Sequence, residues 1–319
     1  MFDKAQAIWR RQRPFGRARS GLSTRPACVL VLQSDGEHKG QDGWTPNAYL
    51  RECHALQYGF ERNGIAADVW GPRHDNYAHR PDFESYDLLL CAENYGLEWL
   101  PDLSAVRRPL KLHWIIDLHC QPASVYDRLT RGCDVVLHAT RRLMGGYETL
   151  HPDRRHLWFP NAVDDRYFDA MKQRRDKSRD VIFVGSNLPE RRAFVRALKQ
   201  RVGLKSVFAT GADMLDLIGS ARIQVNSNLG ADINYRTFET IGLGTCLVTN
   251  EDPDLQALGF EDGVNCLLYR SEDEAAEKIQ AALADGSWEP IGAAGYELSR
   301  RHTYTRRINT LLTELVLAG

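Results

Sequence analysis

Residues 223–249, IQVNSNLGADINYRTFETIGLGTCLVT, decide the fold expected for this chain. The apolar runs at 223–226 and 246–248 are of strand length, and residues 235–243 between them follow a helical pattern that Gly244 ends. A strand, a crossover helix and a second strand predict a parallel sheet. Because the helix begins shortly after the first strand ends, its first turn offers backbone N–H groups and a positive dipole end to a phosphate.

Arg236 and Glu239 are the candidate binding residues of this stretch. Arg236 falls in the first turn of the predicted helix, where a guanidinium can bind a phosphate through two parallel hydrogen bonds. Glu239, three residues on, shares that helix face and can accept hydrogen bonds from sugar hydroxyls. The plain alternative is an ion pair on a solvent-facing helix, which has the same spacing.

The same alternation runs along most of the chain and predicts the fold class. Continuous apolar strands that alternate with helices indicate parallel sheets covered on both faces. Two such series predict an α/β protein with two doubly wound Rossmann-like domains and a cleft between them. The further strands are expected at 28–32, 68–70, 86–92, 110–116, 133–138, 180–184 and 206–209, and the further helices at 47–63, 123–131, 189–201, 272–284 and 304–317.

Composition limits the class of protein without naming its function. The chain has 319 residues, of which 43% are hydrophobic and 26% charged, which excludes a disordered or fibrous protein and favours two domains. No apolar run approaches the ~20 residues that span a bilayer. The polar start lacks a secretory signal, and the seven Cys include no C-x-x-C pair. We therefore expect a reduced, cytoplasmic protein with no transmembrane segment.

The first 26 residues form a basic arm. Residues 1–27 hold seven Lys or Arg against Asp3 alone, although the whole chain has a net charge of −1. Such an arm can dock on a phosphate backbone, an acidic polymer or an anionic membrane surface. The alternative is a solvated extension that packs on the body through Ile8, Trp9 and Phe15.

Several motifs, taken together and in order, resemble a known family. They are Phe159–Asp164 (FPNAVD), Phe183–Ser186 (FVGS) followed by Pro189–Arg192 (PERR), Arg236–Glu239 (RTFE) with Gly244, Glu261–Tyr269 (EDGVNCLLY) and His302–Arg306 (HTYTR). The set resembles group 1 glycosyltransferases of the two-domain GT-B fold, in the branch of spore-maturation (CgeB-like) glycosyltransferases. The resemblance covers about residues 156–317, and the N-terminal half matches only in general shape.

The resemblance implies a metal-independent glycosyltransferase of the hexosyltransferase type. It would move a sugar from a nucleotide-diphosphate sugar to an acceptor hydroxyl. The expected co-substrate is a UDP-sugar, and no cofactor is expected. The implied organisation is a basic arm (1–26), an acceptor-binding domain (27–160), a linker (161–179), a nucleotide-sugar domain (180–300) and a C-terminal helix (301–319).

The family's donor-binding residues carry over onto matching positions of this sequence. The implied diphosphate-binding residues are Gly185, Ser186, Asn187, Arg191, Arg192, Tyr235, Arg236 and Thr237; Glu239 would bind the ribose, and Asn226, Asn228 and Asp232 would lie near the sugar. The broader group usually has a second Glu eight residues before the Glu aligned with Glu239, and this position is Ala231 here. The identity of the sugar and the stereochemistry of transfer are therefore left open.

Residues that follow strands of the first domain are the acceptor-side candidates, because ligands of such sheets bind beyond the carboxyl ends of the strands. Gly36, Glu93 and Asn94 are expected to line the acceptor side. If the reaction inverts configuration, it needs a base, for which Asp117 is the first candidate, His119 the second and Glu93 the third. The alternative for Asp117 is a structural role as a buried residue that caps the following helix. In a retaining reaction, the leaving phosphate itself can take the proton. The acceptor is a carbohydrate, a protein, a small molecule or a modified nucleic acid.

Two other functions stay open at this point. A nucleotide-sugar epimerase on the same fold would need acid and base carboxylates aimed at the sugar, which the Ala231 departure disfavours. A binding module or transferase directed to nucleic acid would dock through the basic arm. Asp252-Pro-Asp254 imitates the D-x-D motif of metal-dependent glycosyltransferases, but it follows a strand in a different context, so no metal site is expected.

Overall fold

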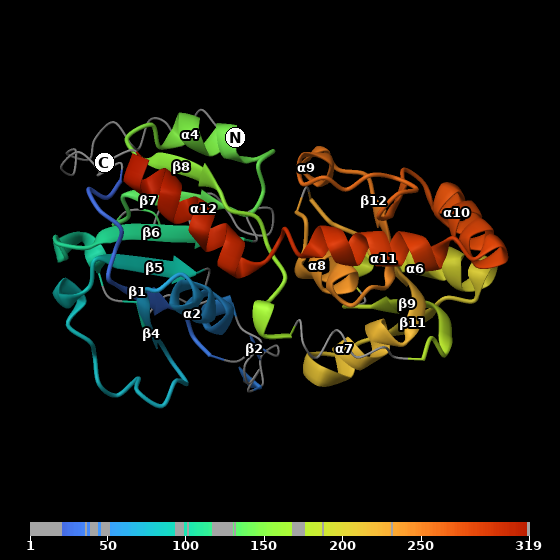
Figure 1. The fold of residues 1–319 in the computed structure, drawn as a ribbon, viewed down its shortest axis with the longest axis horizontal. Helices are drawn as coiled ribbons and strands as arrows, with labels where there is room; N and C mark the ends of the chain where they lie inside the picture. Colours follow the sequence, from blue (N-terminus) through green and yellow to red (C-terminus); the bar gives the residue numbers. More distant parts are fainter. Residues whose placement is uncertain are drawn as a thin grey trace. The chain divides into compact units, whose positions relative to one another are not determined.

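The structure is a computed structural model, and it divides the chain into two compact units (Figure 1). Unit 1 comprises residues 1–160 and 308–319, and unit 2 comprises residues 161–307. Within these ranges the structure describes residues 21–35, 37–38, 44–45, 52–92, 99–100, 102–116, 130, 132–167, 176–186, 188–230 and 232–317.

Unit 1 contains a six-stranded sheet in the order β4-β1-β5-β6-β7-β8, in which every neighbouring pair is parallel. The central strands are continuous apolar runs because both faces of the sheet are covered, and all five residues of β5 are buried. The strands are β1 (Cys28–Leu32), β4 (Ala66–Trp70), β5 (Leu88–Ala92), β6 (Leu110–Ile115), β7 (Val135–His138) and β8 (Arg155–Trp158). The other elements are α2 (Glu52–Arg62), η2 (Phe83–Ser85), η3 (Leu103–Ala105), α4 (Met144–Leu150) and the antiparallel pair β2 (Glu37–His38) and β3 (Trp44–Thr45).

Unit 2 contains a five-stranded parallel sheet in the order β10-β9-β11-β12-β13. The strands are β9 (Arg179–Val184), β10 (Lys205–Val207), β11 (Ala221–Val225), β12 (Cys246–Asn250) and β13 (Leu267–Tyr269). The helices are α6 (Pro189–Val202), α7 (Gly211–Gly219), α8 (Tyr235–Gly242), α9 (Pro253–Ala257), α10 (Glu272–Asp285) and α11 (Trp288–Ser299), with η4 (Asp165–Tyr167) near the start. Helix α12 (Tyr304–Leu317) begins in unit 2 and continues into unit 1.

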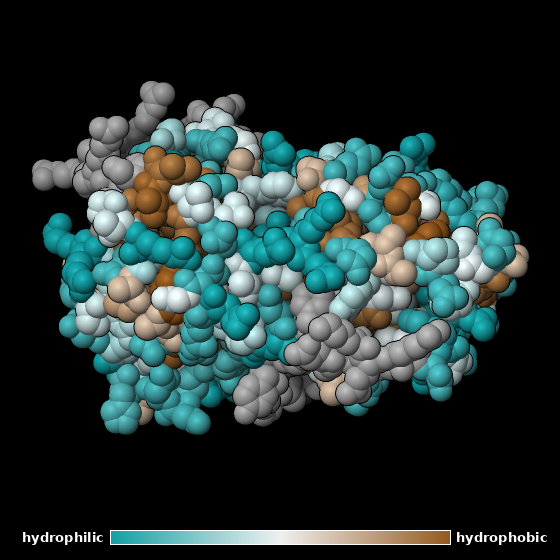
Figure 2. All heavy atoms as spheres, in the orientation of Figure 1, coloured by the Kyte–Doolittle hydropathy of each residue, from teal (hydrophilic) through white to brown (hydrophobic). Residues whose placement is uncertain are grey.

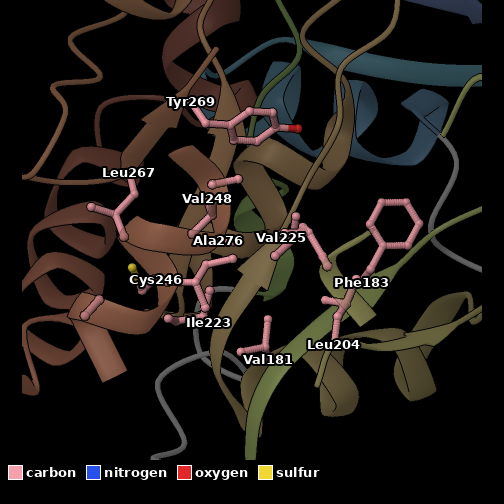
Figure 3. Packing of buried hydrophobic residues seen from close by; sticks show 14 of the residues in the cluster. Val181, Phe183, Leu204, Ile223, Val225, Cys246, Val248, Leu267, Tyr269 and Ala276 are labelled. Carbon is pink, nitrogen blue, oxygen red and sulfur yellow. The ribbon is translucent and has the colours of Figure 1, made fainter. Parts of the chain in front are cut away.

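Alternate residues of four neighbouring strands build one face of the unit 2 core (Figure 3). On β9 these are Val181 and Phe183, and on β11 they are Ile223 and Val225. Cys246, Val248, Leu267 and Tyr269 continue the rows on β12 and β13, and α6 and α10 cover this face. Helices α7 and α8 pack on the same strands but contribute no residue to the cluster, so they cover the other face. The period of two fixes the register, because a slip of one residue would exchange the two faces.

Both sheets have a point at which the strand order reverses. In unit 1 the chain passes from β1 to β4 on one side and then crosses to β5 on the other; in unit 2 it passes from β9 to β10 and then crosses to β11. Doubly wound sheets bind their ligands beyond the carboxyl ends of the two strands at this switch point. The fold therefore directs attention to the residues after β1 and β5 and after β9 and β11.

Two motifs that are far apart in the sequence meet inside unit 2. Val163 of the FPNAVD motif donates its backbone N–H to the carbonyl of His302 at 2.7 Å, and its own carbonyl accepts from Tyr304 N–H at 3.1 Å. The His302 ring is held on both sides, by the Leu258 carbonyl at 2.7 Å and by Arg307 at 2.8 Å. The HTYTR motif thus shapes the start of α12, and His302 has a structural role.

The expectation of two doubly wound parallel sheets is confirmed. Most expected strands and helices agree with observed ones within a few residues, whereas the sequence pattern does not predict α4, α7, α9, α11, β8 or β13. The helix expected at 123–131 lies mostly outside the described residues, and so does most of the basic arm. Among the residues that the structure describes, no helix combines the length and apolar character needed to cross a bilayer.

The face drawn in Figure 2 is mainly hydrophilic. On each unit, apolar side chains occur in small groups among polar ones. The described part of this face thus resembles the surface of an ordinary globular protein, in which scattered apolar side chains are normal.

Candidate functional site

The switch point of unit 2 is where the expected donor-binding residues gather. Strand β9 ends at Val184 and continues into Gly185 and Ser186, and β11 ends at Val225 and continues into Asn226. The next helix after β9 is α6 and the one leading from β11 towards β12 is α8, and neither has a side-chain hydrogen bond at its N-cap. Two helix N-termini, each the positive end of a helix dipole, therefore follow the two strands of the switch point.

Arg236 and Glu239 form an ion pair on the first turns of α8, with 2.7 Å between Nη1 and Oε2. Their side chains are 18% and 26% exposed, so the pair is partly shielded yet reachable from solvent. The guanidinium also contacts the sulfur of Met214 on α7. This packing distinguishes the pair from an exposed i,i+3 pair such as Arg300–Glu297, whose side chains are 63% and 67% exposed.

Arg191 supplies a second guanidinium at the switch point. It lies in the first turn of α6 and donates Nε–H to the carbonyl of Ser227 at 3.0 Å, which ties the start of α6 to the loop after β11. Burial lowers the pKa of Arg191, the positive charge of Arg236 lowers it further, and the carboxylate of Asp232 opposes this effect. Because the positive charges of Arg191 and Arg236 repel each other, an anion bound beside both of them is favoured.

A network of amides holds the loop between β11 and α8. Asn226 is 3% exposed, and its Nδ2 donates to Asn228 at 3.0 Å, Asn234 at 3.1 Å and Thr237 at 3.0 Å. The backbone N–H of Asn228 donates to Asn250 Oδ1 at 2.7 Å, which joins the loop to the end of β12. Asn234 stands at the N-cap of α8 and directs its amide to Asn226 instead of capping the helix. These amides therefore position α8, and thereby Arg236 and Glu239.

Tyr269 closes the network from β13. Its hydroxyl donates to the carbonyl of Asn226 at 2.9 Å, and its ring stacks on Phe194 of α6 with 5.0 Å between the ring centroids. Burial is the main cause that raises the pKa of Tyr269, so its proton stays in this hydrogen bond. Tyr269 belongs to the EDGVNCLLY motif, which thus contributes a hydrogen bond that holds the loop after β11.

The remaining expected donor residues differ in their accessibility. Ser186 and Arg192 are exposed, Gly185 and Tyr235 are partly exposed, and Asp232 and Thr237 are buried. Because Thr237 accepts a hydrogen bond from Asn226, its hydroxyl belongs to the scaffold of the loop. Asn187 and Ala231 lie outside the described residues.

The acceptor-side candidates also lie outside the described residues. This holds for Gly36, Glu93, Asn94, Asp117 and His119. The strands that precede them, β1, β5 and β6, are adjacent and parallel, and end at one edge of the unit 1 sheet. The assignment of the base and of the acceptor contacts stays a prediction.

Unit 1 holds a cluster that sequence reasoning missed. Asp35, His54 and His74 offer ligand atoms that all lie within 4.8 Å of one another. They come from three segments, the loop after β1, the first turn of α2 and the turn after β4. No short-range spacing links them, and only the pairing of β1 with β4 could have pointed to their proximity.

Asp252 of the Asp252-Pro-Asp254 sequence is a helix cap. Its carboxylate accepts the backbone N–H of Asp254 at 2.9 Å at the start of α9, with Pro253 at the first helical position. This is a common way to begin a helix, and it accounts for the residue without a metal.

The arrangement in unit 2 is suited to a phosphorylated ligand that also carries hydroxyl groups. Arg191, Arg236 and the N-termini of α6 and α8 supply hydrogen-bond donors and positive charge. Glu239 supplies acceptors at the same place. The same donors can stabilise negative charge on a departing phosphate.

Comparison with known proteins identifies the family. Residues 154–313, half of the 319-residue chain, match the family model described as glycosyl transferase-like. No curated protein matches the chain.

Solved structures with a similar fold cover between 72% and 92% of the chain. Anabaena HepE, crystallised with UDP-glucose, is 14% identical with a TM-score of 0.58 over 92% of this chain and 100% of that one. Sucrose-phosphate synthase from Thermosynechococcus elongatus is 15% identical with a TM-score of 0.56 over 91% and 100%. The pneumococcal O-GlcNAc transferase GtfA, crystallised with UDP and GlcNAc, is 12% identical with a TM-score of 0.51 over 72% and 57%. These likenesses show a shared two-domain Rossmann-like fold, and on the family match the chain belongs to the glycosyl transferase-like family.

Proposed function

We propose that this protein is a glycosyltransferase that moves a sugar from a UDP-sugar to an acceptor hydroxyl, with the donor bound by unit 2. The observation that carries the proposal is the convergence of Arg191, Arg236 and Glu239 at the switch point. Two guanidiniums and two helix N-termini match a diphosphate, and one carboxylate beside them matches the paired hydroxyls of a ribose.

The choice of UDP is supported by the structural neighbours. HepE was crystallised with UDP-glucose and GtfA with UDP and GlcNAc. Residues other than Arg191, Arg236 and Glu239 would select the uracil, the sugar and the acceptor. That the transferred sugar is a hexose is a further part of the proposal.

Donor binding in this proposal needs no metal ion. The arginines and the helix dipoles can stabilise the leaving diphosphate by themselves. Within the described residues, the group of potential metal ligands, Asp35, His54 and His74, lies in unit 1. Membership in the CgeB-like branch and a cytoplasmic location are further parts of the proposal.

Calorimetric titration of UDP into the full chain and into Arg236→Ala and Glu239→Ala tests the donor site. Each variant loses a charge-assisted contact of roughly 1.5–3 kcal/mol, so we expect Kd to rise roughly ten- to hundredfold. Glu297→Ala removes the acid of an exposed i,i+3 Arg–Glu pair on α11 and is the matched control, with an unchanged Kd. The same affinity in all four proteins would place the nucleotide elsewhere.

A further inference from the structure

The cluster of Asp35, His54 and His74 lies beside the switch point of unit 1, whereas the residues assigned to the donor belong to unit 2. The distance from His54 Nε2 to Asp35 Oδ1 is 3.3 Å, and the side chains are 18% and 24% exposed. The ring of His74 meets the ring of His54 edge-on, with 5.5 Å between the centroids. Two imidazoles and a carboxylate thus face one another in a half-buried place.

The backbone around the cluster holds the segments in close contact. Asp35 donates its N–H to the carbonyl of Pro72 at 2.9 Å, so the loop after β1 is fixed to the turn after β4. A Cβ on Gly71 would lie 2.2 Å from the carbonyl oxygen of Gln33, so only glycine permits this approach. The side chain of Gln33 in turn accepts the N–H of Cys53 at 2.8 Å, which fixes the first turn of α2 next to His54. The fold therefore holds together the three segments that carry these side chains.

The orientation of His74 is a second, independent observation. Its Nε2 lies 3.0 Å from the carbonyl oxygen of Gln33. A carbonyl only accepts hydrogen bonds, so Nε2 carries the proton and Nδ1 carries the lone pair of the neutral ring. Histidines that bind metals almost always donate their other N–H to a carbonyl or carboxylate in this way.

The distances are close to those of a metal site. Ligand atoms at ~2.1 Å from a tetrahedral ion are about 3.4 Å apart, which the His54–Asp35 separation of 3.3 Å matches. The ligand atoms of all three residues lie within 4.8 Å of one another. A plain Asp35–His54 ion pair would explain two members of the cluster but not the orientation of His74.

We propose that Asp35, His54 and His74 form a binding site for a divalent transition-metal ion of the Zn²⁺ class. Imidazole nitrogens select such ions over Mg²⁺ and Ca²⁺, which prefer oxygen ligands. Three protein ligands leave coordination positions open, as in catalytic zinc sites, for water or for a hydroxyl of a bound molecule.

Metal titration of the full-length, metal-stripped protein tests the site. Co²⁺ is the probe, because its visible absorption reports both binding and coordination geometry, and Zn²⁺ competition gives the affinity of the biological candidate. We expect one equivalent of Co²⁺ per chain, displaced by Zn²⁺. His54→Gln and His74→Gln should weaken binding more than the 10–100-fold typical of losing an outer-shell partner. His79→Gln, an exposed histidine five residues from His74, should bind like the wild type.

A variant with a new signature guards against misfolding. His54→Cys keeps a ligand and should add a thiolate-to-Co²⁺ charge-transfer band, which appears only if position 54 binds the ion. No metal uptake by the wild-type chain, or equal uptake by His54→Gln, His74→Gln and the wild type, would overturn the proposal. UDP binding by the same variants is measured separately, because the residues assigned to the donor belong to unit 2, so failure of the metal site and failure of the donor site are distinguishable.

Discussion

His113 in the middle of β6 is fully buried, and neither of its ring nitrogens has a hydrogen-bond partner among the described residues. Burial lowers the pKa of His113 to about 4. In the unfolded chain this pKa is about 6.5, so below pH 6.5 the unfolded state binds a proton that the folded state does not. Stability from this residue is complete above about pH 6.5 and is lost as the pH falls towards 4.

The expected result is a loss of about 2 kcal/mol from His113 alone between pH 7 and pH 5. His113→Leu removes the titrating group and the unpartnered nitrogens, so its free energy of unfolding should fall less over this range. Urea unfolding at both pH values measures the difference, with His79→Gln as an exposed control. Equal acid sensitivity of His113→Leu and the wild type would show that His113 is not the group responsible.

Individual residues differ in how far their roles could be predicted. The proximity of Arg236 and Glu239 follows from helical spacing, because residues three apart share a face. The second guanidinium of the site, Arg191, lies 36 residues from its partner Ser227, and only the sheet order brings the two together. Asn226 and Asn228 were expected near the sugar, and their buried amides engage one another and the loop; contact with a sugar stays a prediction.

Among the secondary-structure elements, α11 shows why the local sequence does not predict some helices. The helix contains Pro290, Gly292 and Gly295, which are poor helix formers. The structure gives the glycines a packing role, because a Cβ on Gly292 would lie 2.8 Å from the carbonyl oxygen of Gly244, and one on Gly295 would lie 2.8 Å from that of Asn265. Local propensity thus argues against the helix, while its contacts with α8 and β12 require these residues.

Gly292→Ala should therefore destabilise unit 2. The added methyl group forces α11 away from the turn after α8, at a cost of about 1–3 kcal/mol. Gly146→Ala is the matched control in α4, where a Cβ meets nothing within 4 Å, and it should be neutral or stabilising by up to ~1 kcal/mol. Urea unfolding compares the two variants. A Gly292→Ala protein as stable as Gly146→Ala would mean that α11 packs less closely than the structure has it.

At the scale of the whole molecule, the sheets were the most predictable feature. Parallel strands covered on both faces must be apolar throughout, and such runs are visible without any knowledge of the partners. The switch points depend on strand order, which no local pattern encodes. The same is true of which unit each end of the chain packs on. The clearest case is α12, which begins beside Val163 in unit 2 and continues into unit 1.

The end of α12 should stabilise unit 1 and not unit 2. Leu315 is fully buried, and its carbonyl accepts the N–H of Leu22 at 2.9 Å. The end of the helix therefore packs against the segment that precedes β1. Leu315→Ala should cost about 2–5 kcal/mol. Leu317, two residues on in the same helix, is 83% exposed, and Leu317→Ala is the matched control.

Hydrogen exchange read by mass spectrometry separates the two units in this experiment. Leu315→Ala should speed exchange in β1, β4 and β5, with β9 and β11 unchanged, because a local loss of packing raises opening only in the unit that depends on it. UDP, in contrast, should slow exchange around β9, β11 and α8 in the wild type and in Leu315→Ala, since a ligand stabilises the unit that binds it. Equal acceleration in both units by Leu315→Ala would mean that the two sheets unfold as one cooperative body, and the division at residue 307 would then describe the architecture but not the stability of the chain.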